Sequence, residues 1–418
     1  MPGPYAGIRV IELGRFIAVP YCGQLLADGG ADVIKIEPLS GDDARRNGTR
    51  LGDTEARQFL NKNRGKRSAA VKISDPRVQA IIRKLAGSAD VIISNFRPGQ
   101  AAELGIDDKT LRATNSRLIY AENSAFGPRG PLSRQPGMDL LLQGLTGLAP
   151  IHDGSPVPFG DPIIDYTAAM LMAWGIATAL FHRERTGKGQ SLDVSLLQAA
   201  LVIQNNSINH VDAADGWRDD FVSYLKDAFS RGATLGDVIA HRDTLKPAIE
   251  PPYYGFFPTR DGMIALAAGG RALQQRAAKA LGVGDPALED DSYQPADIAA
   301  HARAMRAESA AAFRKKTTEH WLGLFAQAGV PAGTIHLKDE ILDHPQAWEN
   351  EYLVRLEHET LGGMTVVAPP VKFSDSPLAI TTASPVLGRH TAEILTEAGL
   401  THGEIDALAG DGVARIAP

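Results

Sequence analysis

Short apolar segments that alternate with helical patterns occupy the first half of this 418-residue chain and constrain its fold more than any other feature. Clusters of β-branched residues predict strands at 8–13, 32–37, 90–94, 118–123 and 191–195. Helices are predicted between them at about 21–28 and 76–85. Strand–helix–strand alternation predicts an α/β fold in which helices cover both faces of a parallel sheet. Such sheets bind their ligands beyond the carboxyl ends of the strands.

The second half of the chain begins after a long apolar helix, predicted from about Tyr166 to Glu184. The stretch TGKGQ at 186–190 is interpreted as the C-cap of that helix. Residues 212–242 are charged and amphipathic without a strand pattern, which indicates a linker or an inserted helical segment. The sequence then predicts two strands joined by a turn at 253–268 and alanine-rich helices at 272–325. Short strands are predicted after 329, and a closing helix at 387–399.

Charge and composition argue against several classes of protein. The net charge is −6 and no basic arm is present, so nucleic acid is not expected as a partner. The N-terminus lacks the pattern of a signal peptide, and the apolar stretch at about 168–180 is interpreted as too short to span a bilayer. The single cysteine, Cys22, excludes intrachain disulfides and cysteine-built zinc sites. A soluble cytoplasmic protein is expected.

Several common catalytic motifs are missing from the sequence. It contains no G-x-S-x-G elbow and no H-E-x-x-H, and G-x-G-x-x-G does not follow the first predicted strand. No histidine pair has helical metal-ligand spacing, so no metal site is expected. The stretch TGKGQ follows a helix instead of preceding one, which disfavours a phosphate loop.

A series of segments in a fixed order resembles the class III CoA-transferases, the family of the formyl-CoA:oxalate and carnitine CoA-transferases. The most characteristic is the segment 165–190, which ends in RERTGKGQ. The other segments that carry the resemblance are 7–37, 41–45, 63–68 (NRGKRS), 89–99, 127–148, 329–333, 344–346 and 387–391. Each is weak alone, but together and in this order they are specific.

The resemblance implies an architecture that the strand pattern alone does not. It implies a Rossmann-like large domain with a parallel sheet and a smaller α+β middle domain, in a chain that forms an interlocked, ring-like homodimer. The expected divisions are 1–211 for the N-terminal part of the large domain, 212–250 for a linker or insertion, 251–328 for the small domain and 329–418 for a return segment that completes the large domain.

Asp165 is the candidate nucleophile. Its position just before a long helix is by itself typical of an N-cap. The family pattern, however, places a catalytic aspartate ten residues before a glycine, and Asp165 stands ten residues before Gly175. Asp161 falls out of this register. The resemblance therefore implies covalent catalysis by Asp165 through an acyl anhydride and an aspartyl-CoA thioester.

The resemblance also implies contacts with coenzyme A, which is expected as a thioester substrate and not as a permanently bound cofactor. The residues aligned with CoA contacts of the family are Ile17, Ala18, Val71, Lys72, Asn95, Phe96, Arg97, Gly137, Met138 and Asp139. Arg97 is the most attractive for phosphate, although an exposed arginine in a turn gives the same local pattern. Formyl-CoA transferases carry other residues at Ile17, Pro38 and Glu103, so specificity for oxalate is not implied.

Other expectations concern the substrates and two alternative functions. The partners expected are an acyl-CoA, a carboxylic acid and a second copy of the chain. A 2-methylacyl-CoA racemase is disfavoured because the catalytic histidine and glutamate of that group align with Met138 and Gly270. A non-catalytic acyl-CoA binding protein is the second alternative. Gly269 and Gly270 are candidate oxyanion donors or an ordinary turn, and 212–242 is a candidate specificity element or lid.

Overall fold

The computed structural model describes residues 2–52, 55–247 and 249–417, which divide into two compact units. The large unit contains 1–152, 156–209 and 345–418, and the small unit contains 153–155 and 210–344. The observed division differs from the expected one at two places. Residues 212–250 belong to the small unit, and the chain returns to the large unit at 345 instead of 329 because β11 (Ala332–Thr334) pairs with a strand of the small unit.

A seven-stranded sheet forms the centre of the large unit, with the order β14-β3-β2-β1-β4-β5-β8. Six strands are parallel neighbours, and only β14 runs antiparallel, against β3. Their bounds are Arg9–Leu13 (β1), Asp32–Glu37 (β2), Lys66–Val71 (β3), Val91–Ser94 (β4), Ile119–Ser124 (β5), Ser191–Ser195 (β8) and Ala414–Arg415 (β14). The parallel sheet expected from the sequence is confirmed, while β3 and β14 were not predicted.

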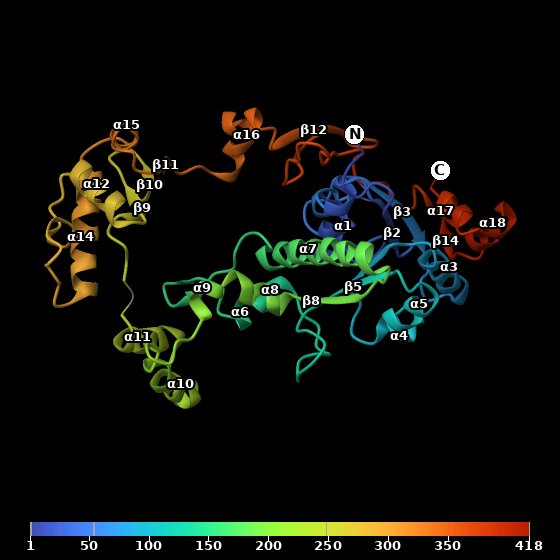
Figure 1. Ribbon diagram of the computed structural model, residues 1–418, viewed down its shortest axis with the longest axis horizontal. Helices are drawn as coiled ribbons and strands as arrows, with labels where there is room; N and C mark the ends of the chain where they lie inside the picture. The colour runs from blue at the N-terminus through green and yellow to red at the C-terminus, as the bar shows by residue number, and fades with distance from the viewer. Residues whose placement is uncertain (1, 53–54, 248, 418) are drawn as a thin grey trace. The chain divides into compact units, whose positions relative to one another are not determined.

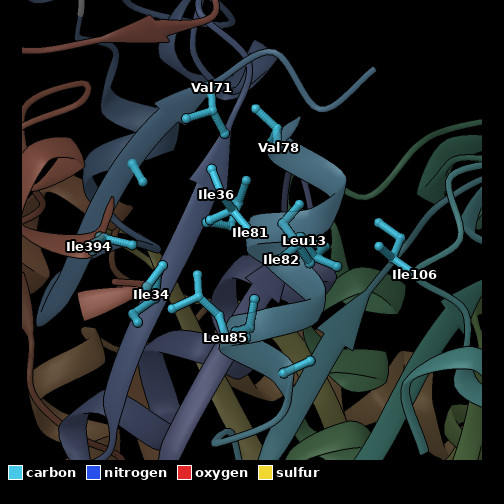
Figure 2. Packing of buried hydrophobic residues seen from close by; sticks show 14 of the residues in the cluster. Leu13, Ile34, Ile36, Val71, Val78, Ile81, Ile82, Leu85, Ile106 and Ile394 are labelled. Atoms are coloured by element: carbon cyan, nitrogen blue, oxygen red, sulfur yellow. The ribbon is translucent and has the colours of Figure 1, made fainter. Parts of the chain in front are cut away.

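Helices cover both faces of this sheet (Figure 1). On one face α3 (Pro76–Ala86) packs on the side chains of alternate strand residues such as Ile11 and Ile34, and Figure 2 shows this cluster from close by. On the other face α1 (Ala18–Asp28) and α7 (Ile163–Thr186) pack on the intervening residues, including Val10 and Val33. Successive side chains of a strand point to opposite faces, so continuous apolar strands bury both faces of the sheet.

The remaining elements of the large unit are short. Before the return segment they are η1 (Asp43–Arg45), α2 (Arg57–Leu60), α4 (Gln100–Glu103), α5 (Asp108–Thr114), α6 (Asp139–Leu145), β6 (Ile151–His152), β7 (Ser155–Pro156), α8 (Leu196–Ile203) and α9 (Asn205–Ile208). The return segment adds α16 (Pro345–Glu349), β12 (Leu353–His358), β13 (Gly362–Val367), α17 (Thr391–Glu397) and α18 (His402–Gly410). Gly187 closes α7 in the left-handed conformation, which confirms the predicted C-cap.

Helix α7 is longer than the apolar stretch at 168–180 indicated. It has 24 residues and a mean hydropathy of 1.5 in its most apolar window, so by length and composition it is able to cross a membrane. The expectation that this apolar stretch is too short to span a bilayer was therefore wrong. Its residues Ala169, Met172 and Ile176 are buried in the cluster that joins α1, α7 and the sheet, and 39 % of its most apolar window is buried.

The small unit is built from an antiparallel three-stranded sheet, in the order β11-β10-β9, and helices packed on it. Strands β9 (Tyr254–Pro258) and β10 (Met263–Ala267) are joined by the predicted turn. The helical elements are α10 (Trp217–Ala228), η2 (Phe229–Arg231), α11 (Leu235–Leu245), α12 (Arg271–Leu281), α13 (Pro286–Glu289), α14 (Ile298–Phe313), α15 (Thr318–Ala328) and η3 (Lys338–Asp343). The region 212–242 is thus mainly helical, which agrees with one of the two expected alternatives, an inserted helical segment. A role as a lid stays a prediction.

Buried ion pairs connect three neighbouring strands of the sheet. Lys35 on β2 and Lys66 on β3 both contact Glu12 on β1, with N–O distances of 2.8 and 2.7 Å. The guanidinium of Arg45 donates to Glu37 and Glu55 at 2.8 Å and to the backbone carbonyl of Pro385 at 3.0 Å. The network therefore ties three strands to the return segment.

Arg45→Met is expected to lower the free energy of unfolding by about 3–5 kcal/mol, because two buried carboxylates lose their partner. The neighbouring Arg46 is exposed, so Arg46→Met is the matched control, with an expected change of about 0.5 kcal/mol or less. Urea unfolding followed by circular dichroism measures both. Equal stability of the two variants would contradict the structural role of the network.

Candidate active site

The strand order reverses between β1 and β4, and two polar loops meet at this switch point. Asn95, just after β4, accepts a hydrogen bond from the N–H of Arg15 and donates one to its carbonyl, both at 3.0 Å. Phe16 has a φ of 64°, and its N–H donates to Oδ1 of Asp42 at 3.2 Å. A Cβ at Gly14 would lie 2.1 Å from the Val19 side chain, so only glycine fits there. The loop after β1 is therefore held in one conformation.

The N-terminus of α1 opens from this loop. Ile17 is its N-cap residue and Ala18 its first residue, and both side chains are buried. Their side chains thus pack in the protein, and the backbone is what they offer to a ligand. The first N–H groups of a helix lack intrahelical acceptors and suit an anion such as phosphate.

Five other residues aligned with CoA contacts lie at the ends of β4 and β3. Phe96 is half-buried and packs against the cluster around α3, while Arg97 is exposed. Val71 ends β3 and its side chain lies inside the same cluster, as Figure 2 shows. Lys72 is exposed. The topology therefore brings Asn95, Phe96 and Arg97 to the switch point and leaves Val71 and Lys72 two strands away.

Asp139 caps helix α7, although it comes from the first turn of α6. Its Oδ2 accepts hydrogen bonds from the N–H groups of Ile164 at 2.8 Å and Asp165 at 3.0 Å. Its Oδ1 accepts from the side-chain amide of Gln143, whose own oxygen accepts from the N–H of Phe159 at 3.0 Å. Because Asp139 is buried and fully engaged, the carboxylate positions α7, and its predicted contact with CoA stays a prediction.

Gly137 and Met138 precede Asp139 where the chain approaches β5. A Cβ on Gly137 would lie 2.6 Å from the side chain of Ala125, so this position also requires glycine. Met138 is the extended N-cap residue of α6 and is 57 % exposed. Of the three expected CoA contacts in this segment, Met138 therefore offers an apolar side chain at the surface.

Asp165 is the third residue of α7, not the residue before it. The N-cap position is occupied by Pro162, and the N–H of Asp165 is itself bonded by Asp139. The interpretation of Asp165 as an N-cap was therefore wrong. It failed because the helix begins earlier than the apolar pattern, under a cap supplied by another helix. The Asp165 side chain is left available at the positive end of α7.

The environment of Asp165 raises the pKa of its carboxyl to about 7. Burial is the main cause, the nearby Asp139 carboxylate adds to it, and Lys62 opposes it. The folded protein therefore holds this group partly protonated near neutral pH. Its ionisation costs stability that is absent below pH about 4, accumulates as pH rises and is complete above about 7.

Lys62 and Tyr166 were missed by the sequence reading. Lys62 follows α2 and is only 4 % exposed, with Nζ 5.6 Å from the centroid of the Tyr166 ring. Tyr166 in turn packs edge-on against Tyr21, with ring centroids 4.9 Å apart. No local pattern distinguishes Lys62 from the basic residues that follow it, so only its contacts reveal it.

The other expectations concern the small unit and metal ions. Gly269 donates its N–H to the carbonyl of Ala267 at 3.1 Å, and Gly270 is the N-cap residue of α12, which fits an ordinary turn. In the described ranges no group of three or more His, Cys, Asp or Glu side chains could hold a metal ion.

Comparison with known proteins identifies the family. The sequence profile of CoA-transferase family III matches residues 5–391. The chain belongs to this family. The mouse (Mus musculus) succinyl-CoA:glutarate CoA-transferase is 31 % identical over 98 % of this chain and 90 % of its own length. The succinate–glutarate CoA-transferase of Agrobacterium fabrum is 34 % identical, over 94 % of this chain and 95 % of its own.

Solved structures of family members have the same fold. Rv3272 from Mycobacterium tuberculosis superimposes with a TM-score of 0.74 at 27 % identity, covering 94 % of this chain and 99 % of that one. A CAIB/BAIF family protein from Brucella suis gives a TM-score of 0.73 at 28 % identity, with coverages of 95 % and 100 %. The chain is an enzyme with CoA-transferase activity, so the interpretation as a non-catalytic acyl-CoA binding protein was wrong.

Asp139→Asn is expected to lower the pKa of Asp165 by about one unit, because the like charge disappears while the amide oxygen still accepts from the helix. Carboxyl-carbon NMR titration, with the signal assigned through Asp165→Asn, measures this shift. Glu103→Gln, at an exposed position of α4, is the control and should leave the titration unchanged. An unchanged pKa of Asp165 in the Asp139 variant would contradict the coupling.

Proposed function

We propose that this CoA-transferase moves coenzyme A from an acyl-CoA to a carboxylic acid through covalent intermediates on Asp165. The observation that carries the proposal is the position of this carboxyl. It lies at the N-terminal turn of α7, held there by Asp139, partly buried and with a pKa of about 7. A carboxylate withdrawn from water is a stronger nucleophile than a solvated one, and the site still leaves it ionised at mildly alkaline pH.

The reaction begins with attack by a carboxylate oxygen of Asp165 on the thioester carbonyl carbon. A C–O bond forms, the C–S bond breaks and the CoA thiolate leaves with the electron pair, so an anhydride remains. The thiolate then attacks Cγ of Asp165, a C–S bond forms and the donor acid leaves as its carboxylate. The acceptor carboxylate then attacks Cγ of the aspartyl-CoA thioester and displaces the CoA thiolate, which gives a second anhydride. The thiolate attacks the acceptor carbonyl of this anhydride, so that the new acyl-CoA forms and the Asp165 carboxylate is released. Water must be excluded, because the anhydride hydrolyses readily.

The switch point is the proposed site for the nucleotide end of CoA. The N-terminus of α1, the fixed loop after β1 and the exposed Arg97 offer N–H groups and a cation for phosphate. Met138 and the glycine before it are the proposed neighbours of the pantetheine arm. Relatives named for succinate and glutarate support short dicarboxylic acids as the first acceptors to test.

Asp165→Ala and Asp165→Asn are expected to reduce CoA transfer by about three orders of magnitude or more, because no other group replaces a covalent nucleophile. The assay follows transfer from succinyl-CoA to labelled glutarate. Mass spectrometry of the wild-type enzyme with acyl-CoA alone should reveal the aspartyl-CoA adduct on the peptide that contains Asp165.

The control is Glu184→Gln, at the other end of α7, where the side chain is 70 % exposed. It should retain activity. Asp165→Asn should also be at least as stable as the wild type at pH 8, since it removes an ionisation that costs stability. Retained transfer in the Asp165 variants, or deuterium exchange at the α-carbon without transfer, would overturn the proposed chemistry in favour of a different reaction.

A second copy of the chain is the proposed partner of the large unit. Helix α7 exposes Met170, Trp174 and Phe181, with Trp174 70 % exposed, and surface patches of this kind are typical of interfaces. The chain enters the small unit after 209 and returns at 345, which is the connectivity that interlocked rings require.

We expect the sedimenting species to have about twice the mass of one chain, which is 44.6 kDa, and to remain dimeric on dilution to nanomolar concentration. Interlocked chains separate only when they unfold, which is the reason for the insensitivity to dilution. Sedimentation velocity with a fluorescent label measures the species present. A folded species of one chain at equilibrium would contradict the interlocked dimer.

A further inference from the structure

Three lysines are buried in the large unit, and one of them differs from the other two. Lys35 contacts Glu12 and Asp42 at 2.8 and 2.9 Å, and Lys66 contacts Glu12 at 2.7 Å. Lys62 is also buried, at 4 % exposure, yet within the described part of the chain it forms no ion pair. Its Nζ donates to the backbone carbonyl of Gln58, at a long 3.3 Å.

A buried ammonium with one weak acceptor is in an unfavourable position. The group carries three N–H donors, and a desolvated cation is stable only beside anions or strong acceptors. The face of Tyr166, 5.6 Å away, supplies a weak attraction. The Lys62 ammonium therefore has N–H donors available for an anion, and burial would make that interaction strong.

Three carboxylates from two segments of the chain act on Lys62. Asp165 is the strongest, followed by Asp161 just before α7 and by Asp42 before η1. These carboxylates oppose the effect of burial, which lowers the pKa of Lys62. In return Lys62 lowers the pKa of Asp165, against the effects of burial and of Asp139. The ammonium and the nucleophile thus share one electrostatic environment.

The negative charge beside Lys62 moves during the proposed reaction. It resides on Asp165 in the free enzyme and on the CoA thiolate while the anhydride exists. Once the aspartyl-CoA thioester has formed, Asp165 is neutral and the charge is on the carboxylate of the released acid. One negative charge is present at every stage, and one fixed cation can therefore stabilise each stage in turn.

We propose that Lys62 is the substrate-carboxylate site of this enzyme: its ammonium attracts the charge of Asp165 in the free enzyme without a direct ion pair, and binds the reacting carboxylate of the acid while Asp165 is covalently occupied. The assignment rests on the covalent mechanism proposed above. It identifies the ligand class as a simple carboxylate, bound through the group that also undergoes reaction. The acid-binding group would then come from the segment between α2 and β3.

Lys62→Met and Lys62→Gln test the assignment, with Lys62→Arg as the charge-conserving variant. Both neutral variants should raise the KM for the acceptor acid by about 10- to 100-fold, with a much smaller effect on the KM for acyl-CoA. The acid limb of kcat/KM for the acyl-CoA should move to higher pH by about one unit, because Asp165 loses its opposite charge. Lys62→Arg should restore the pH profile of the wild type.

Lys109→Met is the control, since Lys109 is an exposed lysine on α5. Circular dichroism and thermal unfolding verify that each variant is folded, and Lys62→Gln keeps a polar group for the Gln58 carbonyl. An unchanged KM for the acid together with an unchanged acid limb in folded neutral variants overturns the inference. Retained transfer in Asp165→Ala would instead overturn the proposed function, so the two failures are distinguishable.

Discussion

Buried ion pairs between β1, β2 and β3 are the interaction on which the rest of the large unit depends. Glu12 forms ion pairs with Lys35 and Lys66, and Lys35 also forms one with Asp42. Asp42 in turn accepts from the N–H of Phe16 and so fixes the loop that opens α1. Desolvated charges of this kind tolerate little displacement, because each one loses its compensation if its partner moves. The buried ion pairs therefore fix the geometry of the switch point.

The fold was predictable where apolar side chains decide the structure. Five parallel strands could be predicted from their clusters of β-branched residues. Four of them are mainly buried, while β8 at the edge of the sheet is partly exposed. The sheet topology then placed Asn95 and Arg97 beside the loop after β1. Strand β3 escaped prediction because it begins with Lys66, Arg67 and Ser68. Two of these are buried only because Glu12 and Glu37, on other strands, satisfy them. A local pattern contains no information on such partners.

The candidate site shows the same division between local and distant information. Family register was sufficient to select Asp165, whereas the start of its helix depends on Asp139, which lies on a different helix. A cap supplied from another helix leaves no mark in the sequence around the helix that it caps. Lys62 resembles its basic neighbours in sequence and differs from them only in having no carboxylate partner among the described residues. Contacts across elements, not composition, determine which charged residues are free to bind a substrate.

The return segment also has a consequence for how this protein is made. Ser68 accepts the N–H of His390 with its carbonyl and the N–H of Gly388 with its hydroxyl, and β14 covers the free edge of β3. These partners are synthesised more than three hundred residues after the strand that needs them. During synthesis the nascent sheet therefore carries an unpaired edge and a partly satisfied set of buried charges. Unpaired edges promote association with other chains, so the large unit is open to misassembly until residues 388–415 have joined β3.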